Sequence, residues 1–191
     1  MFSVCVFCGS AAGQAIPVSA PGPNPWLPVA VATGRLLASQ GWRLVYGGGK
    51  TGLMGALANA CLAAGGEVMG IMPTQLVQRE RAHSGLQQLE VVSDLATRKA
   101  RMIAESDCFL TLPGGLGTLD ELFEVLTWQQ LNLHQKPSVI FNAEGLYNPL
   151  KALFKAQQEA GFIHSPATLY WVNDAEGLQV RLQQLAGAGH V

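Results

Sequence analysis

Short, almost continuously apolar runs alternate along the whole chain with stretches of helical periodicity, and this alternation limits the fold more than any other feature. Uninterrupted apolar runs are typical of central strands in a parallel sheet that helices cover on both faces. Since strand–helix–strand units close with right-handed crossovers, the pattern predicts a single α/β domain over residues 1–191, with a doubly wound parallel sheet of about seven strands. The strands are expected at residues 3–8, 42–46, 67–72, 89–92, 108–112, 137–142 and 168–173, and the helices at 26–40, 53–64, 95–106, 119–132, 147–160 and 175–186.

The low charge of the chain bears on its partners. Charged residues make up 13% of the sequence, against roughly 25% in an average soluble domain, so some apolar surface is expected to meet a second subunit. The net charge is −1 and no basic run is present, which argues against a nucleic-acid partner. No stretch approaches the ~20 apolar residues of a membrane span, so no membrane partner is expected.

Cysteines stand at positions 5, 8, 61 and 108, mostly inside apolar runs. Cys5 and Cys8 form a C-x-x-C, but a redox pair places its second cysteine in the first turn of a helix. Here both fall in the first predicted strand, where a spacing of three puts them on opposite faces. Buried reduced thiols are therefore expected, and with them a cytoplasmic location.

A proline-rich segment follows the first strand, at residues 11–28, and contains five prolines. That density excludes a helix or an inner strand and predicts a loop. The loop follows the carboxyl end of a strand, which is where ligands bind in such sheets. A solvated linker and the wall of a ligand pocket both remain open.

The first glycine loop, residues 47–52 (Gly-Gly-Gly-Lys-Thr-Gly), runs from a strand into a helix. It is no Walker A loop, because Leu44 stands where that motif needs its first glycine. It matches the dinucleotide fingerprint in order, but the next strand carries its acid, Glu67, at the wrong end, so NAD binding is only a second choice. Either the loop lets backbone N–H groups approach an anionic ligand, or its glycines serve a tight turn alone.

The second glycine loop, residues 112–118 (Leu-Pro-Gly-Gly-Leu-Gly-Thr), also joins a buried strand to an amphipathic helix. Its glycines let N–H groups turn inward, the helix dipole adds positive potential, and the Thr118 hydroxyl can donate a hydrogen bond. The segment from Gly114 to Thr118 therefore predicts a cradle for one phosphate group, too short for a triphosphate.

Charged residues flank this cradle. Thr118 and Glu121 fit a capping box, in which Glu121 would only bind the Thr118 N–H. Alternatively, an acid beside a phosphate site points past the phosphate to a sugar hydroxyl or to water. Arg98 and Lys99 open the preceding helix after Asp94, a predicted N-cap. They are either a surface pair or a counter-charge to a bound anion.

Taken together, these segments resemble the LOG family, the cytokinin-activating phosphoribohydrolases once mislabelled as lysine decarboxylases. The resemblance covers residues 4–163. The matching stretches are Phe7-Cys8-Gly9-Ser10, Tyr46-Gly47-Gly48-Gly49, Gly52-Leu53-Met54-Gly55, Arg79-Glu80, Ala82-His83, Arg98-Lys99, Pro113-Gly114-Gly115-x-Gly117-Thr118-x-x-Glu121 and Thr127-Trp128.

The resemblance implies a dimeric Rossmann-like fold and a reaction that releases free base and ribose 5-phosphate from a purine nucleoside monophosphate, either AMP or N6-prenylated AMP. By position, Arg98 and Glu121 correspond to the catalytic pair. The expected substrate contacts, including those from the glycine turns, are Ser10, Gly48, Glu80, Lys99, Gly114, Gly115, Leu116, Gly117, Thr118, Leu119, Asp120 and Thr127.

Three departures from the family pattern bear on the preferred substrate rather than on the reaction. Leu95-Ala96 replaces the usual Met-His pair, Ala11 replaces a second serine, and the proline-rich loop replaces a Gly-x-x-x-x-Tyr lead into a helix.

Glycosidic cleavage places positive charge on the sugar in an oxocarbenium-like transition state. A carboxylate can stabilise that charge and deprotonate water, the role expected of Glu121, while Arg98 would hold the phosphate or ribose. No cofactor is expected, and the scattered histidines suggest no metal site. Two alternatives are a non-catalytic carrier of a nucleotide-like cofactor and a decarboxylase, which would need a pyridoxal-phosphate lysine among Lys50, Lys99 and Lys136.

Overall fold

The fold is a single seven-stranded sheet, all of whose pairings are parallel, in the strand order β4-β3-β2-β1-β5-β6-β7. The computed structural model describes residues 1–14, 23–77, 82–163 and 168–188. The strands are β1 (Ser3–Phe7), β2 (Arg43–Tyr46), β3 (Val68–Pro73), β4 (Gln88–Val92), β5 (Cys108–Thr111), β6 (Ser138–Phe141) and β7 (Leu169–Val172). The helices are α1 (Trp26–Ser39), α2 (Gly52–Ala63), α3 (Leu95–Ala104), α4 (Leu116–Gln130), α5 (Asn148–Glu159) and α6 (Ala175–Ala188), with short 3-10 turns η1 (Thr74–Leu76) and η2 (Ala143–Gly145).

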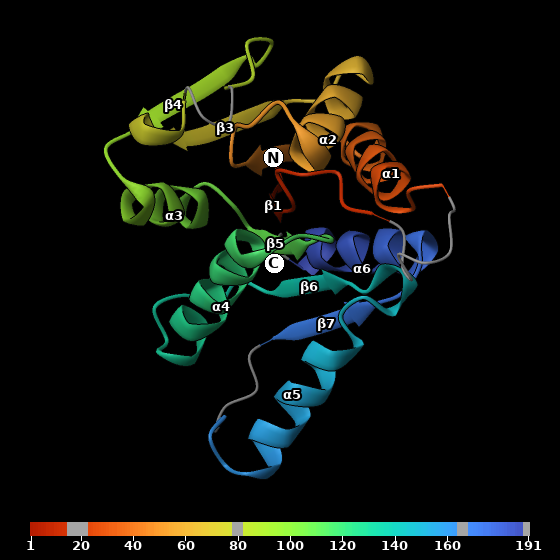
Figure 1. Cartoon of the computed structure of the whole chain (residues 1–191), viewed down its shortest axis with the longest axis vertical. Helices are drawn as coiled ribbons and strands as arrows, with labels where there is room; N and C mark the ends of the chain where they lie inside the picture. The colour runs from red at the N-terminus through yellow and green to blue at the C-terminus, as the bar shows by residue number, and fades with distance from the viewer. Residues whose placement is uncertain (15–22, 78–81, 164–167, 189–191) are drawn as a thin grey trace.

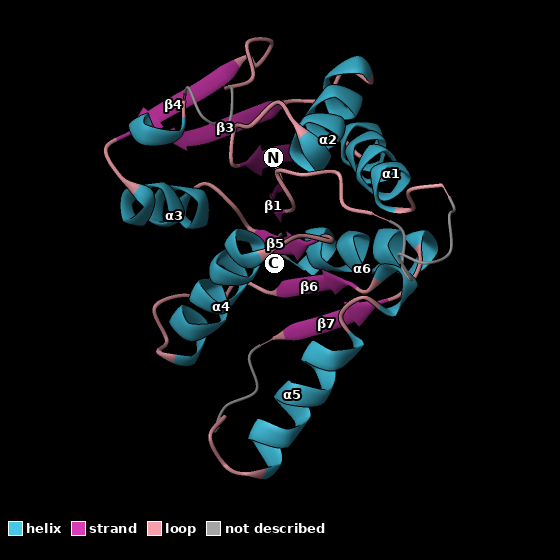
Figure 2. Ribbon diagram, in the orientation of Figure 1, coloured by secondary structure: helices cyan, strands magenta, loops and turns pink. Residues whose placement is uncertain are grey.

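Two hydrophobic cores lie on the two faces of this sheet. One core joins the sheet to α1, α2 and α6, and the other joins it to α3, α4 and α5. Figures 1 and 2 show how these helices are arranged around the sheet. Four of the strands, β1, β3, β5 and β6, are buried along their whole length. The doubly wound Rossmann-like sheet expected from the uninterrupted apolar runs is confirmed.

The strand order reverses at β1, which pairs with β2 on one side and β5 on the other. The loops after these two strands meet there, because the Gly9 N–H donates to the Pro113 carbonyl over 3.0 Å and the Leu112 N–H donates to Phe7. A crevice outside the carboxyl ends of the strands at such a reversal is the usual ligand site of open α/β sheets.

All the predicted strands and helices are present, within a few residues at their ends, but two boundaries were wrong. Helix α1 starts at Trp26, so Pro28 lies in its first turn, where a missing N–H costs nothing. The loop expected over residues 11–28 therefore ends earlier. Helix α4 starts at Leu116 rather than at residue 119, with Gly115 as its N-cap.

The four cysteines all fall in the described part of the chain, and each is buried and unpaired. Cys5 belongs to one core and Cys8 to the other, so they do lie on opposite faces, although Cys8 stands just beyond the end of β1. Burial raises the pKa of both thiols, which favours the inert thiol form over the reactive thiolate. None of the described helices is both long and apolar enough to cross a membrane.

Candidate active site

A cavity of about 170 Å³ lies over the carboxyl ends of β1 and β5, between the starts of α2 and α4. Its polar wall comes from Arg98, Thr118 and Glu121, together with the glycine backbone of both loops. The residues that line it are Val6, Cys8, Gly9, Ser10, Gly47, Met54, Arg98, Gly115, Leu116, Gly117, Thr118 and Glu121. We call this cavity the Arg98–Glu121 cleft.

The central contact of the cleft is an ion pair between Arg98 Nη2 and Glu121 Oε1, 3.2 Å apart. Both residues are buried, with 9% and 8% of their surfaces exposed. Arg98 Nε also donates to the Ile71 carbonyl over 3.1 Å, which fixes the plane of the guanidinium. A buried charged pair of this kind contributes little net stability, since desolvation offsets its attraction. The pair is therefore a functional candidate.

Arg98 reaches the cleft from α3, whose start is firmly capped. The predicted N-cap, Asp94, is confirmed, and its carboxylate accepts the Thr97 N–H over 2.8 Å. Hydrogen bonds from the Ser93 hydroxyl and from Thr97 lower the pKa of Asp94 to about 2. Arg98 itself lies one turn inside the helix, not at its first position.

Gly47 makes room for the guanidinium. A Cβ added at Gly47 would stand 2.0 Å from Arg98 Nη2, well inside any allowed contact. The first glycine loop is thus part of the site, but through a missing side chain. The sequence alone does not reveal this purpose of Gly47, because the contact joins segments far apart in the chain.

The N–H groups at the start of α2 are already engaged, since Leu53 and Met54 both donate to the Gly9 carbonyl. The first glycine loop is therefore held as a tight turn against Gly9, and these two N–H groups do not face an anion. Gly52, at a φ of +61°, packs directly on Ser10. Gly48, at +79°, packs on Met72 and Leu89 rather than lining the cleft.

The start of α4 is different, because Gly115 is its N-cap and provides no side-chain hydrogen bond there. The capping-box interpretation of Thr118 and Glu121 is wrong: Thr118 is the third residue of the helix, and the Leu119 N–H already donates to Gly115. Asp120 and Glu121 accordingly lie beyond the first turn. The uncapped helix start faces the cleft, and this is the arrangement that binds a single phosphate.

Gly114 and Thr118 are in close contact, since a Cβ at Gly114 would stand 2.0 Å from the Thr118 hydroxyl oxygen. Thr118 is 3% exposed, so its hydroxyl is held at the base of the cradle.

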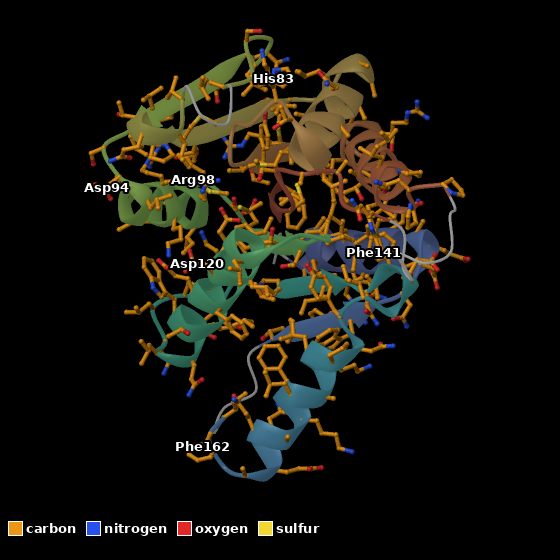
Figure 3. The ribbon with its side chains drawn as sticks, in the orientation of Figure 1. His83, Asp94, Arg98, Asp120, Phe141 and Phe162 are labelled. Atoms are coloured by element: carbon orange, nitrogen blue, oxygen red, sulfur yellow. The ribbon has the colours of Figure 1, made fainter. Side chains whose placement is uncertain are left out.

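The remaining predicted contacts that the structure describes lie outside the cleft. Lys99 pairs with Asp120 over 3.1 Å and with Glu124. Burial would lower the pKa of Lys99, but hydrogen bonds to these two carboxylates outweigh it and the pKa is raised. Leu119 packs into the core on its face of the sheet. Glu80 lies outside the described residues. Figure 3 shows Arg98, Asp94 and Asp120 on the α3–α4 side of the molecule.

A second hollow, of about 380 Å³, adjoins the cleft and shares Gly9, Ser10 and Gly115 with it. Its wall includes residues 11–14 and Trp26, whose indole N–H donates to the Gln14 carbonyl over 2.8 Å. The described part of the proline-rich segment thus lines a pocket, as one of its two interpretations required.

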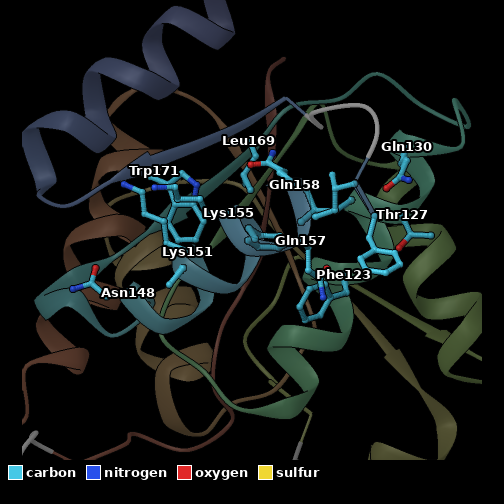
Figure 4. Close-up of a pocket in the computed structure, with 15 residues that line it drawn as sticks. Phe123, Thr127, Gln130, Asn148, Lys151, Lys155, Gln157, Gln158, Leu169 and Trp171 are labelled. Atoms are coloured by element: carbon cyan, nitrogen blue, oxygen red, sulfur yellow. The ribbon is translucent and has the colours of Figure 1, made fainter. Parts of the chain in front are cut away.

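A larger groove, of about 830 Å³, runs between α4, α5 and β7 (Figure 4). Its walls combine aromatic and aliphatic side chains, among them Phe123, Phe154 and Trp171, with amide side chains and two lysines. None of the described residues that line it is an acid, a histidine or a cysteine. Thr127 lines this groove, on a face of α4 different from that of Glu121. The groove is larger than the cleft but lacks a charged pair such as Arg98 and Glu121, so the cleft is the candidate active site.

The fold and the cleft together define a Rossmann-like α/β enzyme with a buried arginine–glutamate pair beside a free helix start. A family model described as "possible lysine decarboxylase" matches residues 54–180. The chain is 45% identical over 167 residues to the cytokinin riboside 5′-monophosphate phosphoribohydrolase of Rhodococcoides fascians, covering 87% of this chain and 80% of that protein. It is 39% identical over 182 residues to an Arabidopsis thaliana enzyme of the same name, covering 95% and 81%. The chain belongs to this LOG family of phosphoribohydrolases and is a hydrolase.

Solved structures of the same architecture include the molybdenum cofactor carrier protein of Chlamydomonas reinhardtii, with a TM-score of 0.72, 20% identity, and coverage of 97% of this chain and 98% of that one. The molybdenum cofactor binding protein of Rippkaea orientalis has a TM-score of 0.69 and 21% identity, and the match covers 97% and 96%. At such identity these matches establish the fold alone.

Proposed function

We propose that this chain hydrolyses the N-glycosidic bond of purine nucleoside 5′-monophosphates, AMP or an N6-modified, cytokinin-type AMP, to free base and ribose 5-phosphate. The observation that carries the proposal is the buried Arg98–Glu121 pair beside the uncapped start of α4. Relatives at about 40% identity that are named for this reaction support it.

The phosphate would bind the N–H groups at the start of α4 and the Thr118 hydroxyl. The volume of the cleft, about 170 Å³, is below the roughly 300–1,000 Å³ of sites that enclose a whole drug-sized ligand. The phosphate and ribose would therefore fill it, and the base would extend past Leu116, which is 86% exposed at the rim.

The chemical step needs a water molecule aligned on C1′. As the bond between C1′ and the base nitrogen breaks, its electron pair leaves with the base and positive charge develops on the sugar. Glu121 would stabilise that charge and accept a proton from the water, whose oxygen bonds to C1′. This proton would then pass to the departing base, which restores the Glu121 carboxylate. Arg98, fixed by Ile71, would orient the Glu121 carboxylate and direct its remaining N–H groups to the phosphate or ribose.

The decarboxylase alternative finds no support in the lysines. All five stand in the described part of the chain, and none lines the cleft. A Schiff-base lysine needs a lowered pKa, whereas that of Lys99 is raised. Lys136 donates to the Ile103 carbonyl over 2.7 Å.

A homodimer is part of the proposal. The sequence is only 13% charged, and the groove between α4 and α5 leaves Phe123 39% and Phe162 75% exposed. A second copy that covered this groove would bury that apolar surface.

The decisive experiment is incubation with AMP, with and without EDTA, followed by chromatography for adenine and ribose 5-phosphate. Stoichiometric release of both, unaffected by EDTA, is the expected result. Tight AMP binding without release would favour a non-catalytic carrier instead.

A further inference from the structure

One tyrosine bridges both ends of the turn that leads into the phosphate cradle. The Tyr147 hydroxyl donates to the Leu112 carbonyl over 2.8 Å, and the backbone N–H of Gly114 lies near enough to the same oxygen to lower the pKa of the hydroxyl. Pro113, which has no N–H of its own, lies between these two contacts. The single hydroxyl therefore closes the turn from β5 to the start of α4.

Tyr147 is itself rigidly held. It is 5% exposed, and its backbone N–H donates to Asn142 Oδ1 over 2.7 Å. The Asn142 amide in turn donates to Asn148 over 2.8 Å and to Asn173 over 3.3 Å. Burial, followed by the neighbouring Cys8, raises the pKa of Tyr147, so the hydroxyl keeps the proton that it donates.

The turn needs such a support because its own residues are conformationally free. Gly114 and Gly115 have no Cβ, and the N-cap position of α4 provides no side-chain hydrogen bond. Apart from Tyr147, the turn is tied through Pro113, whose carbonyl accepts the Gly9 N–H over 3.0 Å. Glycine backbone loses more conformational entropy than any other residue when it is fixed in one geometry.

We propose that Tyr147 is a positioning residue that preorganises the Gly114–Thr118 cradle for the substrate phosphate, acting through the backbone of Leu112 and Gly114. The inference rests on the proposed function for the identity of the phosphate ligand. Tyr147 does not line the cleft, so its effect on catalysis passes entirely through the loop. When the loop is already ordered, binding of the substrate does not have to pay the entropy of ordering it. Loss of the Tyr147 hydroxyl should therefore weaken phosphate binding more than it slows the chemical step.

The test is Tyr147→Phe, which removes one hydroxyl and keeps the ring. Tyr46→Phe is the matched control, because Tyr46 is also buried and its hydroxyl donates to a carbonyl of the other glycine loop, Gly49, over 3.2 Å. Calorimetry with AMP and with inorganic phosphate, and kcat/KM for AMP and for adenosine, are measured on both variants. Both are first shown to be folded by circular dichroism at the assay temperature.

For Tyr147→Phe we expect AMP and phosphate binding to weaken by about tenfold, the typical effect of one buried hydrogen-bonding group. KM for AMP should rise more than kcat falls, and kcat/KM for adenosine should stay unchanged. For Tyr46→Phe, the ratio of kcat/KM for AMP to kcat/KM for adenosine should equal that of the wild type. Equal effects on AMP and adenosine, or equal ratios in the two variants, would overturn the inference.

The outcomes separate this inference from the proposed function. If the wild type binds AMP and phosphate but releases no adenine, the proposed reaction fails, and the calorimetric comparison still decides the role of Tyr147. If adenine is released and Tyr147→Phe matches the wild type, the inference alone fails. A wild type that binds neither ligand would overturn both.

Discussion

Arg98 Nη2 lies 3.2 Å from Glu121 Oε1, although the two residues belong to different helices, α3 and α4, with β5 between them in the chain. Neither residue is placed there by the demands of the core. Replacing a buried ion pair by apolar residues of similar volume is often neutral or stabilising, so the pair points to chemistry rather than to stability.

The phosphate requirement follows from the uncapped start of α4. AMP should be cleaved far more efficiently than adenosine, because binding energy from a remote phosphate can be used to orient the reacting sugar. Hydrogen bonds to a charged group contribute about 1.5–3 kcal/mol each, so the loss of two predicts a fall in kcat/KM of roughly a hundredfold or more. Comparable kcat/KM values for both substrates, measured by adenine release, would show that the cradle binds something else.

Gly47→Ala should impair the enzyme although it replaces no charged residue. The added Cβ would stand 2.0 Å from Arg98 Nη2, so the guanidinium must move away from Glu121. A displacement of about 1 Å at a reacting centre can cost roughly a hundredfold in rate, and we expect a loss of tenfold to a hundredfold in kcat for AMP. Gly187→Ala, where the new Cβ meets nothing within 4 Å, is the control. Normal turnover by Gly47→Ala would contradict the placement of Arg98.

The N-cap of α3 predicts a pH dependence of stability. The pKa of Asp94 is lowered from 3.8 to about 2, first by the Ser93 hydroxyl and then by Thr97. A carboxylate whose pKa is depressed by folding stabilises the protein above its unfolded pKa, and that contribution disappears as the pH falls from about 4 towards 2. Asp94→Ala should therefore have a lower urea midpoint than the wild type at pH 6, and the two should converge as the pH is lowered. A constant difference down to pH 3 would argue against an ionised cap.

The oligomeric state tests the exposed groove. Light scattering at micromolar concentration should give a homodimer. Phe162 is 75% exposed at the groove, so Phe162→Asp should shift the equilibrium towards monomer, because an interface would have to bury the new charge. A wild-type monomer would leave the apolar groove without its proposed partner.

A structural feature can be predicted from the sequence when the residues that cause it are neighbours in the chain. The central strands β1, β3, β5 and β6 could be located because nearly continuous apolar runs mark buried parallel strands. The start of α4 was missed because its first residue, Leu116, is 86% exposed and its N-cap is a glycine, so the Thr118–Glu121 spacing imitated a cap. Arg98 and Glu121 could be named from the family resemblance, but their contact depends on the long crossover through α3. The contributions of Gly47, Ile71 and Tyr147 were not predicted, because each acts on a segment distant in sequence.

Glu121→Gln separates a chemical role from a structural one most sharply. The capping box does not exist, and a glutamine oxygen at position 121 can still accept a hydrogen bond from the Arg98 guanidinium. The neutral amide cannot take a proton from water or stabilise positive charge on the sugar, and general-base roles are worth roughly a hundredfold to ten-thousandfold in rate. We expect a folded Glu121→Gln that still binds AMP in calorimetry and releases adenine at least about a hundred times more slowly.

The matched control for that variant lies one turn further along α4. Glu124→Gln removes a second carboxylate from the same helix, one that pairs with Lys99 outside the cleft, and its effect on turnover should stay within about fivefold. Arg98→Ala should lower turnover and also weaken AMP binding, because it removes a cation from beside the phosphate cradle. Near-normal adenine release by Glu121→Gln would end the catalytic assignment, whereas equal losses in Glu121→Gln and Glu124→Gln would show that charge on α4, and not the position of Glu121 at C1′, controls the rate.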